Sequence, residues 1–207
     1  MLYYLLDGAR CGGKLDDIKA IDPGIRSLYR GRSEESLTSV APYILTLSDQ
    51  IQSFISKNGL GLSWGIALES PADTDELFMH FRKFLIVQTE DYKQLYFRFY
   101  DPRVLRVFLP TCDGKQLAEF FGPVRRFYCE SEDPSMALIF SIDNKVLKTE
   151  SVSASSIYKN VGSAPAASPM PSSSASHAES SNGPTTSEGT EPQASEIKPR
   201  RRFIFGS

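Results

Sequence analysis

Residues 94–108 read QLYFRFYDPRVLRVF and contain the change from strand to helix that decides the fold class. In the first half, two sets of side chains alternate, and a period of two predicts a strand with two different faces. Asp101-Pro102 then predicts a helix start, because aspartate is a preferred capping residue and proline suits the first helical turn. The apolar residues that follow at helical spacing are Val104, Leu105 and Phe108. The stretch therefore predicts a strand over residues 94–100 and a helix that buries one side.

Strands and helices are also predicted on both sides of this stretch, in no regular βαβ order. The other strands are predicted over residues 2–6, 63–69, 124–130, 136–142 and 145–149. The other helices are predicted after Ser33, over residues 49–58, after Ser70 and after Asp113. Such a mixture predicts the α+β class, with a single globular domain, a mixed β-sheet and packed helices.

Local patterns predict where these elements end and which faces they present. The expected caps are Ser48, Ser70 with Pro71 at the first helical position, and Asp113 with Gln116 as a capping box. In the strand over residues 63–69, alternation places Trp64 and Ile66 on the same face, together with Leu68. A hairpin turn is expected at Asp143-Asn144.

The composition changes near residue 150. Residues 1–150 contain nearly all of the aromatic side chains and are predicted to form the globular domain. Residues 151–207 are rich in Ser, Pro and Ala and predict a disordered tail, because too few large apolar residues are present to offset the chain entropy lost on folding. The tail ends in a basic and aromatic tip at residues 198–205, whose candidate docking residues are Arg201, Arg202, Phe203 and Phe205. The tip is equally compatible with a docking motif and with a plain soluble tail end.

The overall composition argues against several classes of protein. The formal net charge of −2 disfavours a nucleic-acid-binding protein and a protein that binds membrane surfaces. No apolar run approaches the roughly 18 residues of a spanning helix, and the start of the chain does not have the pattern of a signal peptide. The three cysteines predict neither a disulfide framework nor a zinc site, because they are odd in number and widely spaced. We therefore expect a cytoplasmic protein with reduced thiols and no membrane partner.

The glycine-rich segment GARCGGK at residues 8–14 resembles the start of a phosphate-binding loop. Leu15 follows at the place where such a loop needs Ser or Thr as a magnesium ligand. Nucleotide binding through this segment is the alternative to a structural turn that leaves the first strand.

No catalytic or metal-binding set of residues is apparent. His80 is the one histidine before residue 150, and its neighbours Arg82 and Lys83 favour a solvent-exposed helix face. His177 lies in the predicted tail, and metal ligation needs several well-placed ligands. No serine lies in a nucleophile-elbow pattern. We therefore expect a protein that is not an enzyme and uses no cofactor and no metal.

Five charged residues lie within apolar surroundings: Asp7, Arg10, Arg98, Asp101 and Arg103. A charge in such surroundings is unfavourable unless it is paired, so these side chains are candidates for an internal network in which arginines bridge to aspartates. The alternative is a partner-binding site, since arginine and aromatic residues are enriched at binding hot spots.

Seven motifs, read in order, resemble one protein family. They are Tyr4-Leu5-Leu6-Asp7-Gly8-Ala9-Arg10, Ser27-Leu28-Tyr29-Arg30-Gly31, Val40-Ala41-Pro42-Tyr43, Ser63-Trp64-Gly65-Ile66, His80-Phe81-Arg82-Lys83-Phe84, Phe97-Arg98-Phe99-Tyr100-Asp101-Pro102-Arg103-Val104-Leu105 and Phe120-Phe121-Gly122-Pro123-Val124. Together, over about residues 3–130, they resemble the adaptor-chaperone domains encoded beside type VI secretion spike genes, often called Tap or TEC proteins.

This resemblance implies a non-enzymatic adaptor in a Gram-negative bacterium. Its expected partners are a type VI secretion effector, which is a toxin, and the VgrG spike protein on which the effector is mounted. Longer members of the family have a second, largely helical lobe, and here the Ser/Pro-rich tail stands in its place. We therefore expect that the folded domain holds one partner while residues 199–205 bind another.

Overall fold

A computed structural model describes residues 1–30, 37–88 and 94–156 of the chain. The tail candidates Arg201, Arg202, Phe203 and Phe205 lie outside the described residues, as does the start of the helix predicted after Ser33. The described residues that follow Ser33 form one short 3-10 turn, η2 (Thr38–Val40), ahead of a strand.

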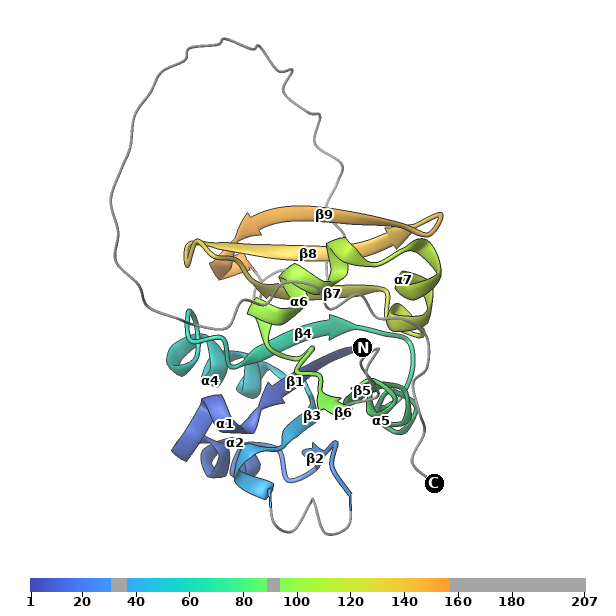
Figure 1. Cartoon of the computed structure of the whole chain (residues 1–207). Coiled ribbons are helices and arrows are strands. Elements are labelled where there is room, and N and C mark those ends of the chain that lie inside the picture. Colours follow the sequence, from blue (N-terminus) through green and yellow to red (C-terminus); the bar gives the residue numbers. More distant parts are fainter. Residues whose placement is uncertain (31–36, 89–93, 157–207) are drawn as a thin grey trace, which may run out of the picture.

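One seven-stranded sheet runs through the molecule in the order β2-β3-β1-β4-β7-β8-β9 (Figure 1). Its strands are β1 (Leu2–Asp7), β2 (Arg26–Ser27), β3 (Pro42–Thr46), β4 (Gly65–Glu69), β7 (Arg126–Glu130), β8 (Met136–Asp143) and β9 (Val146–Ser153). Neighbouring strands in this sheet pair antiparallel throughout. Two further strands, β5 (Ile86–Gln88) and β6 (Gln94–Tyr96), form a separate antiparallel ribbon. The expected α+β class is confirmed.

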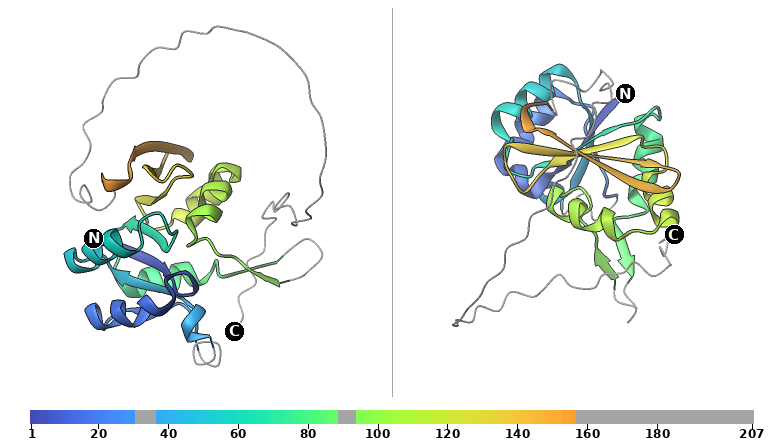
Figure 2. Two further views of the ribbon diagram at one scale, coloured as in Figure 1. Left: turned by 90° about the vertical axis from the view of Figure 1, so that its left-hand side faces the viewer. Right: turned by 90° about the horizontal axis from the view of Figure 1, so that it is seen from above.

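Helices cover both faces of the sheet, as the two views of Figure 2 show. One face carries α1 (Gly8–Cys11), α2 (Leu15–Ile21) and α4 (Asp49–Asn58), and the other carries α5 (Thr74–Arg82), α6 (Pro102–Phe108) and α7 (Gly114–Phe121). The side chains of β1 alternate between the two helix layers. Tyr3 and Leu5 pack on the α5–α7 side, whereas Tyr4 and Leu6 pack on the α1–α4 side. In the described part of the chain, no helix is long and apolar enough to cross a membrane.

The local helix signals were largely correct. The helix over residues 49–58 is present, and its Ser48 side chain accepts a hydrogen bond from the Ile51 amide. Asp113 and Gln116 form the expected capping box of α7. The hairpin turn lies at Asn144-Lys145, one residue later than expected, and β9 continues to Ser153.

Other details of the sequence prediction were wrong. The helix α5 begins at Thr74, and its cap is Asp73, which accepts a hydrogen bond from the Glu76 amide. The Ser70 hydroxyl accepts from the Ala72 amide in the turn before the helix and donates to the Pro123 carbonyl oxygen. Trp64 precedes β4 and packs in the α1–α4 layer, on the opposite side of the sheet from Ile66.

The strand predicted over residues 94–100 ends at Tyr96. Phe99 and Tyr100 are adjacent but both buried, which a continuing strand could not achieve with one face in solvent. The chain turns there to enter α6, and this turn places Arg98 and Asp101 beside the end of β1.

Candidate functional site

Four of the five charged candidates come together where β1 ends and α6 begins. Asp7 ends β1 and caps α1, while Asp101 caps α6. Arg98 forms an ion pair with Asp7, and its Nη2 atom lies 3.9 Å from Oδ2 of Asp101. Arg103 holds Asp101 through two hydrogen bonds, Nε to Oδ1 at 3.0 Å and Nη2 to Oδ2 at 2.7 Å. The result is an alternating chain of two carboxylates and two guanidinium groups.

The carboxylates of this cluster are buried and the guanidinium groups reach the surface. Asp7 and Asp101 are 1% and 2% exposed, whereas the side chains of Arg98 and Arg103 are 43% and 53% exposed. Burial alone would raise the pKa of Asp101, but hydrogen bonds from Arg103 and the charges of Arg103 and Arg98 lower the pKa below its ordinary value. The aspartates are therefore suited to fix the orientation of two arginines that face solvent.

Arg10, the fifth candidate, is not part of this cluster. Its Nε and Nη2 atoms donate to the carbonyl oxygen of Leu62 at 3.0 and 2.7 Å, at an exposed position. Its contact is with the loop before β4 and with no carboxylate of the cluster.

The β5–β6 ribbon adds exposed apolar side chains next to the arginines. Ile86 and Tyr96 are cross-strand partners and are 40% and 60% exposed, and Leu95 is 43% exposed. The ribbon extends away from the body of the molecule in Figure 2. The Tyr96 ring also contacts the Tyr29 ring, with centroids 6.1 Å apart.

We call these four residues the ribbon surface: Ile86, Tyr96, Arg98 and Arg103. Leu95 points to the opposite face of the β5–β6 ribbon, because side chains alternate along a strand. The ribbon surface combines large apolar groups with two arginines that buried carboxylates hold in place, and this is the composition of a protein-binding hot spot. The alternation of residues 94–100 pointed to Arg98, but the exposure of Leu95 and Tyr96 was not predicted. It follows from the separation of β5 and β6 from the main sheet, which no local pattern shows.

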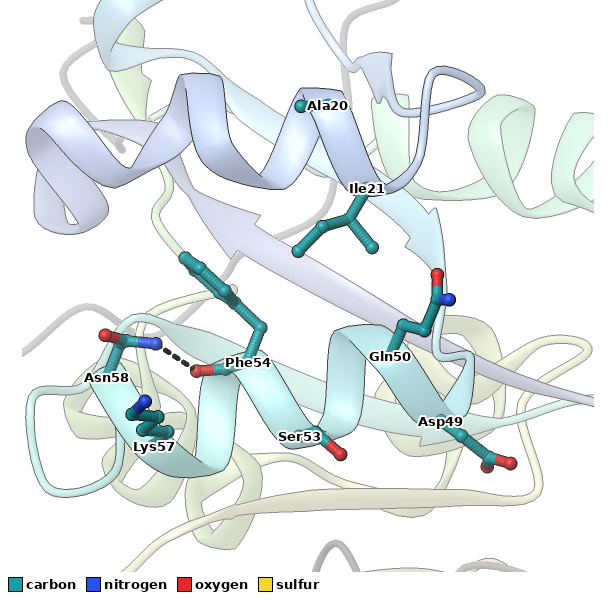
Figure 3. Close-up of a pocket in the computed structure, with 8 residues that line it drawn as sticks. All are labelled: Ala20, Ile21, Asp49, Gln50, Ser53, Phe54, Lys57 and Asn58. Carbon is teal, nitrogen blue, oxygen red and sulfur yellow. Dashed lines mark hydrogen bonds between the residues drawn. The ribbon is translucent and has the colours of Figure 1, made fainter.

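A second surface feature lies between α2 and α4, where a shallow groove is open to solvent (Figure 3). Ile21 and Phe54 give it apolar walls, and Asp49, Gln50 and Lys57 line it with polar groups. The sequence predicted the helix α4 but not that α2 packs beside it, so this groove was not predicted.

The glycine-rich segment does not form a phosphate-binding loop. Residues 8–14 fold into α1 and the short 3-10 helix η1 (Gly12–Lys14). The Gly8 amide donates to the Ala41 carbonyl oxygen, and the Ala9 amide donates to Oδ1 of Asp7. Lys14 pairs with Asp17 at 3.1 Å. These groups already have protein partners, so nothing here supports the nucleotide-binding alternative.

His80 was expected on a solvent-exposed face, and this was wrong, since it is 7% exposed. Its Nε2 atom lies 2.8 Å from the carbonyl oxygen of Phe120, and its ring lies edge-on to the rings of Phe81 and Phe84. Burial lowers the pKa of this imidazole. Its place in the aromatic core depends on Gly122, whose missing side chain leaves room for the ring.

The thiols and acidic groups of the described residues do not suggest catalysis. Burial raises the pKa of Cys11 to about 11 and those of Cys112 and Cys129 to about 12, which disfavours reactive thiolates. Over residues 1–30, 37–88 and 94–156, no group of three or more His, Cys, Asp or Glu side chains is placed to hold a metal ion.

Comparison with known proteins gives one match. A family model described as a domain of unknown function, DUF4123, matches residues 2–119, more than half of the 207-residue chain. The matched segment begins with β1 and contains the whole ribbon surface. No curated protein and no solved structure matches the chain.

Proposed function

The chain belongs to the DUF4123 family, which is associated with the effector adaptors of type VI secretion, and from this membership we propose that it is a non-enzymatic adaptor. In this proposal it binds a type VI effector in the bacterial cytoplasm and helps to load that effector onto the VgrG spike. The family match over residues 2–119 is the observation that carries the proposal.

The ribbon surface is the proposed contact with the effector. An exposed arginine loses conformational freedom when it binds a partner, and this loss is smaller where a buried carboxylate already fixes the guanidinium group. Arg98 and Arg103 are fixed in this way by Asp7 and Asp101. Tyr96 and its cross-strand partner Ile86 supply apolar area beside them, so an effector segment with acidic and aromatic side chains would complement the surface.

The test of this function is co-expression of the full chain with the effector and VgrG proteins encoded beside its gene. We expect the tagged chain to retain the effector, or an effector–VgrG assembly, through affinity purification and gel filtration. Elution of the chain alone, with both other proteins folded and present in the same lysate, would contradict the proposal.

The tail is proposed to act as a tether between the globular domain and a docking tip. Arg201, Arg202, Phe203 and Phe205 restore basic and aromatic character after a segment nearly devoid of large apolar residues. Tethering a second contact raises its effective concentration. Deletion of residues 198–207 should therefore weaken retention of one of the two partners, and unchanged binding of both would exclude a docking role.

A further inference from the structure

Among the described residues, the strand β9 forms an edge of the seven-stranded sheet. Among the described strands it pairs with β8 alone, and it lies at the margin of the sheet in Figure 1. It is eight residues long, whereas the strand at the opposite edge, β2, has two residues. A long edge strand presents a row of backbone donors and acceptors that can pair with another strand.

The hairpin geometry fixes which backbone groups of β9 point outward. Asn144 and Lys145, the two residues of the turn, have φ values of 49° and 64°, as the tight hairpin turn with two positive φ angles requires. Asp143 and Val146 close this turn as a hydrogen-bonded pair, and such pairs then alternate along the strands. The even-numbered residues of β9 therefore bond to β8, and the odd-numbered ones direct their amides and carbonyls away from it. The Ala154 amide, which donates to the Ser135 carbonyl oxygen, follows the same alternation.

The side chains of β9 are complementary to those of a second β9 in one antiparallel register. With Thr149 opposite Thr149 of the second copy, Lys148 of each copy lies opposite Glu150 of the other. Val146, which is 56% exposed, lies opposite Val152. The charged pairs and the valine pairs both occupy positions without mutual backbone hydrogen bonds, where side chains approach most closely. The backbone hydrogen bonds across the axis come from Thr149, whose amide and carbonyl point away from β8.

The neighbouring registers are unfavourable. Each face of a strand must stay on the same side of a continuous sheet, so the register can change only in steps that preserve the faces. If the two-fold axis moves by one residue along β9, Lys148 lies opposite Lys148 of the second copy, or Glu150 lies opposite Glu150. Like charges directly opposite each other destabilise a strand pair.

We propose that β9 is a self-complementary edge through which two copies of this chain pair, with the two-fold axis at Thr149 and two reciprocal Lys148–Glu150 contacts. The pairing joins the two sheets into one across the dimer. It uses a strand of the seven-stranded sheet, whereas β5 and β6 form a separate ribbon, and it does not depend on whether the chain carries an effector.

Charge exchange tests the proposal in the full chain. Lys148→Glu and Glu150→Lys each convert both contacts into repulsions, and each should weaken the dimer roughly 10- to 100-fold in analytical ultracentrifugation. Both side chains are exposed, so the fold should be unchanged by circular dichroism. An equimolar mixture of the two variants should restore the dimer as a heterodimer, because the two carboxylates that the first variant carries at positions 148 and 150 then face the two ammonium groups of the second.

Cross-linking provides an independent readout. Thr149→Cys should give a covalent dimer under mild oxidation, since the two β-carbons are neighbours across the axis. Ser153→Cys, at the end of the same strand, is the matched control and should remain monomeric because its counterpart lies at the far end of the interface. A wild-type chain that stays monomeric up to its solubility limit would overturn the proposal. A dimer that neither charge variant weakens, or a mixture that fails to pair, would do the same.

Discussion

Burial gives two single residues of this chain a larger effect on stability than their sequence context indicates. His80 lies among phenylalanine rings with one ring nitrogen against a backbone carbonyl, and Asp7 is a buried carboxylate that serves both an arginine and a helix N-terminus. Neither residue is part of a catalytic arrangement among the described residues. Their effects should therefore appear in stability measurements.

His80 should make the domain lose stability in mild acid. Burial, opposed by the hydrogen bond to Phe120, lowers the pKa of the folded-state imidazole below its ordinary value of 6.5. Between the two pKa values the unfolded chain binds more protons than the folded one. Stability is therefore complete above pH 6.5 and decreases as the pH falls below it, by at most about 1.4 kcal/mol per pH unit, until the folded pKa is reached.

Chemical unfolding between pH 7 and pH 5 checks this expectation. His80→Gln should remove most of the decrease in the free energy of unfolding over this range. His177→Gln, which changes the histidine of the predicted tail, is the matched control and should leave the decrease in place. Identical pH profiles for the His80 variant and the wild type would contradict the account.

Asp7→Ala should destabilise the domain by about 1–3 kcal/mol, because it removes a helix cap and leaves Arg98 without its closest carboxylate. The loss is limited by the partial exposure of Arg98, which water can solvate. Asp7→Asn retains a capping oxygen and should lose less. Urea unfolding followed by circular dichroism measures both variants, and an alanine variant as stable as the wild type would refute the role given to Asp7.

The ends of the elements depend on particular backbone conformations. Two helices end at glycines of nearly the same geometry: Gly12 has φ 51° and ψ −131°, and Gly122 has φ 49° and ψ −113°. Their surroundings differ. A Cβ atom on Gly122 would lie 2.3 Å from Cε1 of His80, whereas a Cβ atom on Gly12 would meet nothing within 4 Å.

This pair of glycines separates backbone strain from steric overlap. Gly12→Ala should cost about 1–2 kcal/mol through strain alone. Gly122→Ala should cost the same strain and, in addition, the displacement of His80 from the aromatic core, for a total of roughly 3 kcal/mol or more. Denaturant unfolding of both variants gives the comparison. Equal losses would show that the contact between Gly122 and His80 has no energetic importance.

At the same scale, sequence patterns predicted the elements whose signals are local. The Ser48 cap and the capping box of Asp113 and Gln116 depend on residues three apart, and both formed as expected. Ser70 had the same local signal, yet its hydroxyl bonds to Pro123, 53 residues away. The strand β3 was not predicted, and it forms by pairing with β1 and β2. Tertiary contacts decided both cases.

At the scale of the whole molecule, the α+β class could be predicted, whereas the strand order could not. The ion pair between Arg98 and Asp7 joins residues 91 positions apart, so a pattern of charges could nominate its members but could not assign the partners. Arg10, which was a candidate for the same network, bonds to a backbone carbonyl elsewhere. The groove between α2 and α4 and the projecting β5–β6 ribbon likewise arise only when the sheet is assembled.

The central claim is that the ribbon surface binds a type VI effector, and the most direct test is calorimetric titration of the effector encoded beside this gene. The wild-type chain is compared with Tyr96→Ala and Arg103→Ala, after circular dichroism has shown that both variants are folded. Leu62→Ala is the matched control, since Leu62 is a 50% exposed apolar residue in the loop before β4, outside the ribbon surface. The account predicts that each ribbon-surface variant raises Kd roughly tenfold or more, while the Leu62 variant binds like the wild type. Equal affinity for all four proteins would contradict it.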